Sequence, residues 1–177
     1  NGVEIVNYIL QKKLYEDINE VDNYGWTAFL ICARFNNEEV LNFLYENGLD
    51  WKKKSNYGDS CFTVAAWNED LSVIKFIYDY GLYEDVNETD NDGWTALQNA
   101  IRGNKNIDII KYLLKIGVGI DNKTNKYRYT FLHCAMANEN SEIIKYVVEY
   151  INFFQTNNKH IEFAYSKKKL YLCSDIG

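Results

Sequence analysis

The sequence contains no proline, although a chain of this length would hold about nine at an average usage of about 5%. This absence excludes collagen-like, polyproline and Pro-rich linker sequences. It also removes the strongest signal for the end of a helix, so turns must be located from Gly, Asn and Asp. The hydrophobic fraction of 47% and the charged fraction of 25% are typical of a folded chain, and 177 residues suit one domain.

Basic charge is also scarce. The net charge is −6, and of the 19 basic residues only Arg34, Arg102 and Arg128 are arginines. This balance disfavours nucleic acid and anionic membranes as partners. The sequence has no apolar run of about 18 residues, and its start does not resemble a signal peptide. We therefore expect a cytoplasmic chain that neither binds nucleic acid nor inserts into a membrane.

Cysteine and histidine are few and scattered. No C-x-x-C pair occurs among the four cysteines, which are Cys32, Cys61, Cys134 and Cys173. This spacing predicts reduced, intracellular thiols rather than disulfides or a zinc site. Only His133 and His160 could act as bases near neutral pH, and neither adjoins a nucleophile motif. Because no phosphate-binding loop is present either, we expect no enzymatic activity, no cofactor and no metal.

What the sequence does contain is an internal repeat. Four similar segments begin 33, 35 and 35 residues apart, at Gly25, Gly58, Gly93 and Arg128. In each segment a hydroxyl residue follows two positions later, where it can cap a helix. An apolar stripe of helical period comes next, and a glycine closes it in the first three units, at Gly48, Gly81 and Gly117. Each unit therefore predicts a turn, a helix, a loop and a second helix, and such units must stack to bury their stripes.

The pattern of each unit resembles the ankyrin repeat: a turn glycine, a Thr, an apolar residue, a small residue and paired aliphatics, at a period near 33. The resemblance covers about residues 1–152. It implies an all-α repeat solenoid, an ankyrin-like stack of helix-turn-helix units with short β-hairpin-like fingers. The bias towards Asn, Lys, Ile and Tyr is typical of members encoded by AT-rich genomes.

The chain departs from the family pattern at two positions of each unit. The family's Pro is replaced in all four units, by Ala28, Cys61, Ala96 and Phe131. The family's His remains only as His133, and its other positions hold Leu30, Thr63 and Gln98. Losing a preorganised first helical residue and a hydrogen bond is expected to soften the units. Arg128 stands where a turn glycine is expected, which predicts a distorted fourth finger.

We divide the chain into three parts: a partial repeat over 1–22 (a second helix and a finger), four ankyrin-like repeats over 23–152, and a divergent C-terminal cap over 153–177. The apolar pattern at the start resembles a second helix without its first, so we expect either a fragment of a longer array or an atypical cap. Residues 14–23 are nearly repeated at 82–91, an offset of 68. This favours duplication by pairs of units, with drift from one consensus as the alternative.

In ankyrin-like stacks, the finger tips and the exposed end of each first helix line a concave binding face. The resemblance therefore implies a partner-binding set of Tyr24, Trp26, Arg34, Phe35, Tyr57, Asp59, Trp67, Asp92, Trp94, Tyr127 and Tyr129. Eight of these residues are aromatic, and Trp, Tyr and Arg are over-represented at binding hot spots. Together with Asp59 and Asp92, they would suit a partner with apolar anchors and a basic group. The alternative is that the tryptophans pack on neighbouring hairpins.

The sequence therefore predicts a monomeric, non-enzymatic scaffold that binds another protein through its concave face. Two alternatives remain open. One is a regulatory or targeting segment of a longer enzyme or toxin, and the other is a structural solenoid that self-associates through its ends. Because a shared fold does not fix function, the identity of the partner is not predicted.

Overall fold

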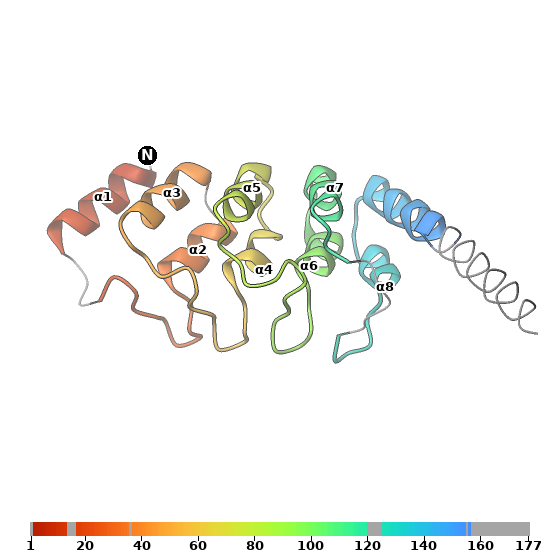
Figure 1. Cartoon of the computed structure of the whole chain (residues 1–177), viewed down its shortest axis with the longest axis horizontal. Helices are drawn as coiled ribbons and strands as arrows, with labels where there is room; N and C mark the ends of the chain where they lie inside the picture. The colour runs from red at the N-terminus through yellow and green to blue at the C-terminus, as the bar shows by residue number, and fades with distance from the viewer. Residues whose placement is uncertain (1, 14–16, 36, 120–124, 155, 157–177) are drawn as a thin grey trace, which may run out of the picture.

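The computed structural model describes residues 2–13, 17–35, 37–119, 125–154 and 156. Its helices alternate between two layers along the molecule (Figure 1). The inner layer, on the side of the fingers, holds α2 (Ala28–Phe35), α4 (Cys61–Ala65), α6 (Ala96–Gly103) and α8 (Phe131–Met136). The outer layer holds α1 (Gly2–Lys12), α3 (Glu38–Glu46), α5 (Leu71–Asp79), α7 (Ile107–Lys115) and a helix over 141–154. No β-strand occurs within these ranges, and the predicted all-α repeat solenoid is confirmed.

The inner helices begin after the four hydroxyl residues that the sequence predicts as caps, Thr27, Ser60, Thr95 and Thr130. Each accepts a hydrogen bond from the backbone N–H three residues later. In three units the side chain at that later position bonds back to the N–H of the cap residue, from Thr63, Gln98 and His133. Thr63 and Gln98, which stand where the family has His, thus complete a capping box at the start of their helices.

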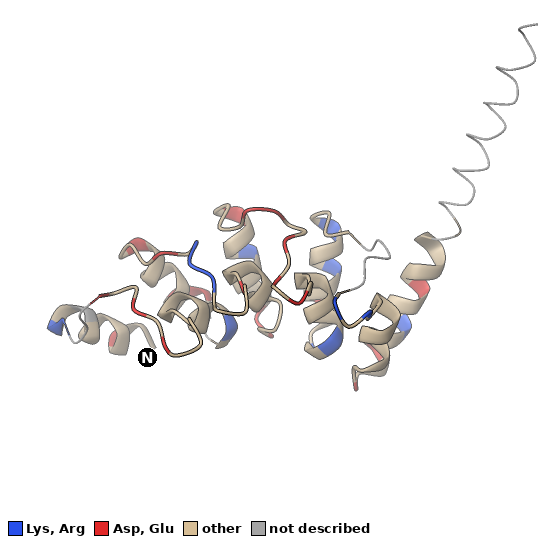
Figure 2. Ribbon diagram, turned by 90° about the horizontal axis from the view of Figure 1, so that it is seen from below, with Lys and Arg blue, Asp and Glu red and all other residues tan. Residues whose placement is uncertain are grey.

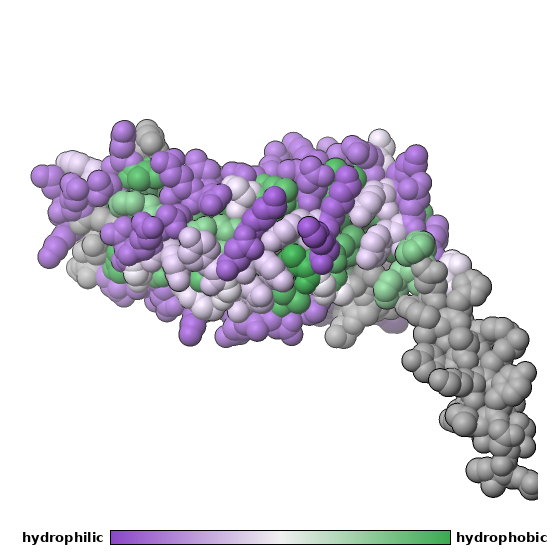
Figure 3. Space-filling model, turned by 45° about the horizontal axis from the view of Figure 1, so that its top comes forward, coloured by the Kyte–Doolittle hydropathy of each residue, from purple (hydrophilic) through white to green (hydrophobic). Residues whose placement is uncertain are grey.

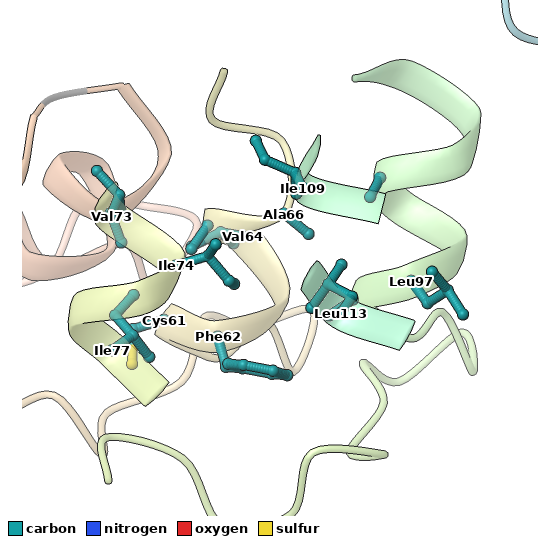
Figure 4. Packing of buried hydrophobic residues seen from close by; sticks show 14 of the residues in the cluster. Cys61, Phe62, Val64, Ala66, Val73, Ile74, Ile77, Leu97, Ile109 and Leu113 are labelled. Atoms are coloured by element: carbon teal, nitrogen blue, oxygen red, sulfur yellow. The ribbon is translucent and has the colours of Figure 1, made fainter. Parts of the chain in front are cut away.

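The apolar core lies between the two layers and continues from unit to unit (Figure 4). Phe62 of α4 and Leu97 of α6 are fully buried, as are Ile74 and Ile77 of α5. Burying such a side chain stabilises the fold by about 1.5–3 kcal/mol relative to leaving it exposed. Because much of this burial is made between units, each unit depends on its neighbours for its stability.

Buried asparagines connect the inner helices of successive units. The side-chain amide of Asn68 donates to the carbonyl of Ala33 at 3.1 Å, and that of Asn138 donates to the carbonyl of Ile101 at 2.8 Å. Asn104 makes the equivalent bond in the unit between them. These amides satisfy carbonyls at the ends of the inner helices, which would otherwise lack partners. They set the register between units together with the apolar packing.

The fingers are joined to one another in a similar way. The backbone N–H of Asn56 donates to the carbonyl of Tyr24 at 2.9 Å, and that of Asn91 donates to Tyr57 at 2.8 Å. Each finger thus lies close against the glycine of the finger before it, and a Cβ on Gly25 would be 2.6 Å from Asn56. Glycine is required at this position both for its φ of 79° and for the space it leaves.

The fourth finger keeps the same turn although Arg128 replaces the glycine. Arg128 has a φ of 62°, beside 79°, 80° and 83° for Gly25, Gly58 and Gly93, and its N–H donates to the carbonyl of Asn125 at 2.8 Å. The expected distortion of this finger is therefore wrong. Within the ranges that the structure describes, no later finger packs against Arg128, so a side chain has room. The left-handed conformation still costs an L-residue about 1–2 kcal/mol.

The two ends of the stack differ from its middle. Helix α1 lies in the outer layer beside α3, and no inner helix lies beneath it among the described residues. This arrangement suits the partial unit predicted over 1–22, whose boundary stays a prediction. At the other end, the helix over 141–154 crosses the predicted boundary between 152 and 153. Residues 155 and 157–177 of the predicted cap lie outside the described part of the chain.

Candidate protein-interaction site

One polar side chain shapes each finger, and these side chains belong to Asp22, Ser55, Asp90 and Asn125. Each accepts hydrogen bonds from the backbone N–H groups two and four residues later. In the first finger, the N–H groups of Tyr24 and Trp26 donate to Asp22 Oδ1 at 2.8 and 2.9 Å. The eight residues whose N–H groups donate these bonds all belong to the predicted partner-binding set, so the turns fix the positions of their backbones. These anchors were not predicted from the sequence, although an Asp, Ser or Asn recurs three residues before each turn glycine and before Arg128, its equivalent in the fourth unit.

The first row of predicted contact residues lies along the finger tips. Tyr24 and Tyr57 are 58% and 56% exposed, and their rings stack with centroids 6.3 Å apart. The equivalent position of the third unit holds Asp92, which accepts a hydrogen bond from the hydroxyl of Tyr127 at 2.8 Å. Tyr127 is exposed as well. The tips therefore form one row in which each side chain touches that of a neighbouring finger. Figure 2 shows the fingers from below, with acidic residues distributed along them.

The second row of predicted contact residues is less exposed, and each of its members lies two residues after a member of the first row. Trp26 and Asp59 are half-buried and Tyr129 is exposed, but Trp94 is only 8% exposed. The ring of Trp94 packs against Tyr129 at 5.6 Å between centroids and against the guanidinium of Arg102 at 4.9 Å. Most of Trp94 is therefore unavailable to a partner. Its structural role is to position these two neighbours, as the alternative of hairpin packing expects.

At the end of α2, three aromatic rings surround one guanidinium. The Cζ atom of Arg34 lies 5.1 Å from the ring centroids of Phe35 and Trp67 and 5.9 Å from that of Trp26. Phe35 is 69% exposed, the most of any large apolar residue described. Trp67 lies against Gly103 of the next unit, where a Cβ would overlap its ring. The structure thus brings Trp26, Arg34, Phe35 and Trp67 together as one surface cluster.

The sequence analysis missed a residue that belongs with this set, Arg102. Arg102 lies 68 residues after Arg34, the offset at which the finger sequence also repeats, and stands over Trp94 as Arg34 stands over Trp26. That offset was the signal by which it could have been found. We use the term inner face for the surface made by the eleven predicted residues and Arg102.

Bonds within the chain engage both carboxylates of the inner face. Asp59 accepts a hydrogen bond from the hydroxyl of Ser55 at 2.7 Å. Asp92 is bonded to Lys126 and to Tyr127, and these bonds lower the pKa of its carboxyl. Burial lowers the pKa of Arg34, against the smaller opposite effect of the Asp59 carboxylate. Asp59 thus bonds within its own finger, and Asp92 links the third finger to the fourth.

Two apolar grooves lie near the ends of the stack. One, of about 420 Å³, is lined by residues of α1, the first finger and α2, and it includes Val6, Ile9 and Ile31. The other, of about 470 Å³, is lined by Tyr129 and by Leu132, His133 and Met136 of α8. In the inner units, residues equivalent to Leu132 and Met136 are buried by the following unit. The second groove thus contains positions that are covered in the earlier units and uncovered here among the described residues.

The described residues offer little for catalysis. The imidazole of His133 lies 2.7 Å from the hydroxyl of Thr130 and takes part in capping α8. Cys32, Cys61 and Cys134 are buried thiols that form no disulfide, and burial raises the pKa of each. In the part of the chain that the structure describes, no three His, Cys, Asp or Glu side chains are placed to hold a metal ion. None of the described helices combines the length and apolarity needed to cross a membrane.

The paired helices, capped turns and linked fingers define the class of protein: an ankyrin-type helical repeat solenoid. Comparison with known families agrees. A family profile described as ankyrin repeats in three copies matches residues 62–159, and one described as ankyrin repeats in many copies matches residues 1–44 and 32–77. The chain belongs to the ankyrin repeat family, as the sequence predicts.

The chain is also similar to an ankyrin repeat protein of fowlpox virus (strain NVSL), with 29% identity over 154 residues. The similar region is 85% of this chain but only 45% of that protein. The chain therefore spans less than half the length of this relative.

Proposed function

We propose that the chain is a non-enzymatic scaffold that binds a partner protein through its inner face. Ankyrin repeats are in general protein-interaction modules and ankyrin repeat proteins are typically not enzymes, which supports the class of function. The choice of the inner face is the proposal. The monomeric state and the cytoplasmic location stay predictions.

The single observation that carries this proposal is the row of exposed aromatic rings held by fixed turns. Tyr24, Tyr57 and Phe35 each expose more than half of their surface to solvent. Their backbones are held by the anchors of the fingers and by α2, so a partner would not have to order them. Large rings that are already ordered bury much area on binding at a low cost in entropy.

The outer face is a weaker candidate. Figure 3 shows the molecule with the outer helices turned towards the viewer, and this surface is mainly hydrophilic with separate small apolar areas. Protein interfaces need a contiguous, desolvated centre, which scattered apolar residues do not supply. The inner face, by contrast, places Trp26, Phe35 and Trp67 around one guanidinium.

Affinity capture with surface variants tests this proposal. The variant combines Tyr57→Ala, Phe35→Ser and Trp67→Ala and leaves Trp94 unchanged, because truncating a buried tryptophan would damage the core. The matched control is Tyr8→Ser, which removes an equally exposed ring from α1 in the outer layer. Proteins captured from lysate by the native chain and by the control, but not by the folded triple variant, would support the inner face. Equal recovery by all three would contradict it.

A second candidate function is that of a regulatory or targeting segment of a longer enzyme or toxin. Two observations favour it: the fowlpox virus relative is more than twice as long as the matched region, and the apolar groove under α1 has the place of an inner helix. The full reading frame tests it. A further domain with catalytic residues in the same frame would support this function, whereas a frame that holds only ankyrin units would remove it.

A further inference from the structure

Two positive charges of the inner face have no ion pair among the described residues, whereas one of its two carboxylates does. The sequence suggests a basic partner, because Asp59 and Asp92 belong to the predicted set. The structure pairs Asp92 with Lys126 and Tyr127, so a cationic partner would have to compete with Lys126 for this carboxylate. Asp59 accepts a hydrogen bond from the neutral hydroxyl of Ser55 and keeps its charge.

The two arginines of the inner face, unlike Asp92, have no charged partner among the described residues. Among the described residues, neither Arg34 nor Arg102 has an ion pair or a hydrogen-bonded acceptor, and each guanidinium lies over an indole ring. These ring contacts supply no hydrogen-bond acceptor in the plane of a guanidinium, so the N–H donors of both arginines lack a described acceptor. A guanidinium held in this way is prepared for bidentate bonding to a carboxylate.

The arginines also have a defined spacing. Arg34, Trp67 and Arg102 each lie seven residues after the cap residue of successive units, at the ends of α2, α4 and α6. Packed helices lie about 8–10 Å apart, so two steps along the inner layer separate the axes of α2 and α6, which carry the two arginines, by about 16–20 Å. An extended peptide rises about 3.3 Å per residue and covers this distance in about five or six residues.

We propose that the partner's bound segment is acidic and extended. Two carboxylates, about five or six residues apart, would bond to Arg34 and Arg102, and an apolar side chain between them would pack on Trp67. This inference rests on the proposed function, because it specifies what the inner face binds. Although the chain carries a net charge of −6, recognition depends on the local charges. On the inner face, two guanidiniums and one carboxylate, Asp59, have no ion pair among the described residues.

A substitution at Asp59 tests whether the ligand is acidic or basic. Its carboxylate acts electrostatically on Arg34, whereas Trp94 and Tyr129, the residues equivalent to Asp59 in the third and fourth units, are uncharged. Replacing Asp59 by Asn removes the negative charge and keeps an oxygen that can accept the Ser55 hydroxyl bond. An acidic ligand should then bind roughly two- to fivefold more tightly, whereas a basic ligand should bind more weakly.

The experiment is selection of a random linear peptide library on the native chain, followed by fluorescence titration of the enriched peptides. We expect Asp or Glu at two positions five or six residues apart, and an affinity that falls with salt. Arg34→Gln and Arg102→Gln should each weaken binding about 10- to 100-fold. Lys75→Gln, which removes a cation stacked over Tyr112 in the outer layer, should change affinity less than twofold.

The outcomes separate this inference from the proposed function. Enriched peptides that lack acidic residues, or that bind more weakly to the Asp59→Asn variant, would overturn the acidic ligand. If such peptides still depend on Trp67, the inner face stands as the interface. Enrichment of no peptide at all would count against both proposals. Tighter binding of a single-stranded oligonucleotide than of any peptide, lost in Trp67→Ala, would also overturn the inference.

Discussion

The indole of Trp67 lies against Gly103 of the next unit, and a Cβ at position 103 would overlap the ring. Gly103 is the last residue of α6 and has no positive φ, so its backbone does not require glycine. Its role is to leave space for Trp67. One glycine thus positions a ring that lies between Arg34 and Arg102 along the inner layer.

Gly103→Ala is expected to destabilise the native chain and to stabilise a Trp67→Ala variant. Alanine favours a helix over glycine by about 0.5–1 kcal/mol, but in the native chain this gain is opposed by the overlap with the indole. The measurement is a double-mutant cycle by chemical denaturation. A gain in stability of the same size in both backgrounds would show that the two residues do not interact.

Arg128→Gly is expected to raise the free energy of unfolding by about 0.5–1 kcal/mol. Glycine removes the strain of a φ of 62° and loses part of that gain to the greater entropy of the unfolded chain. Gly58→Ala is the matched opposite. Gly58→Ala should lower the free energy of unfolding by about 1–3 kcal/mol, because the φ of Gly58 is 80° and Asn91 lies where the added Cβ would be. A destabilised Arg128→Gly variant would contradict this account of the fourth finger.

The buried thiols are expected to be unreactive in the folded protein. Burial raises the pKa of Cys32 and Cys134 to about 11 and raises that of Cys61 as well, so almost no thiolate forms near neutral pH. The measurement is titration with a thiol reagent in a Cys173→Ser variant, which removes the cysteine outside the described residues. No thiol should react quickly before unfolding, and three should react afterwards. Rapid reaction of the folded chain would contradict this prediction.

The contact between Asp92 and Lys126 is expected to stabilise the fingers in a pH-dependent way. Bonds to Lys126 and Tyr127 hold the pKa of Asp92 below its usual value of 3.8. A carboxyl with a lowered pKa contributes its stability above the unfolded pKa and loses it as pH falls through the folded pKa. An NMR titration should therefore show Asp92 titrating below 3.8 in the native chain and closer to 3.8 in Lys126→Gln. An unchanged pKa in that variant would contradict the assigned cause.

Much of the fold could be predicted from the sequence because its signals are local and repeated. A hydroxyl before each inner helix and a glycine after α3, α5 and α7 identify the ends of these helices without knowledge of the packing. What could not be predicted depends on contacts between units. Arg128 keeps its turn at a place where no later finger packs among the described residues, and the side-chain amide of Gln98 also donates to the carbonyl of Tyr129 in the next unit.

The candidate site was predictable to a smaller extent. Its aromatic composition is visible in the sequence, but the burial of Trp94 and the bonds that engage Asp59 and Asp92 are not. These depend on which side chain of the neighbouring finger lies within reach.

Site-specific photo-crosslinking tests the central claim, binding of a partner protein by the inner face, most directly. A photoreactive phenylalanine analogue placed at Phe35 reports on the inner face, and the same analogue at Tyr8 reports on the outer layer. We expect crosslinked partner protein from position 35 and none from position 8 in cells that express the chain. Crosslinks from position 8 alone, or equal crosslinks from both positions, would contradict the claim.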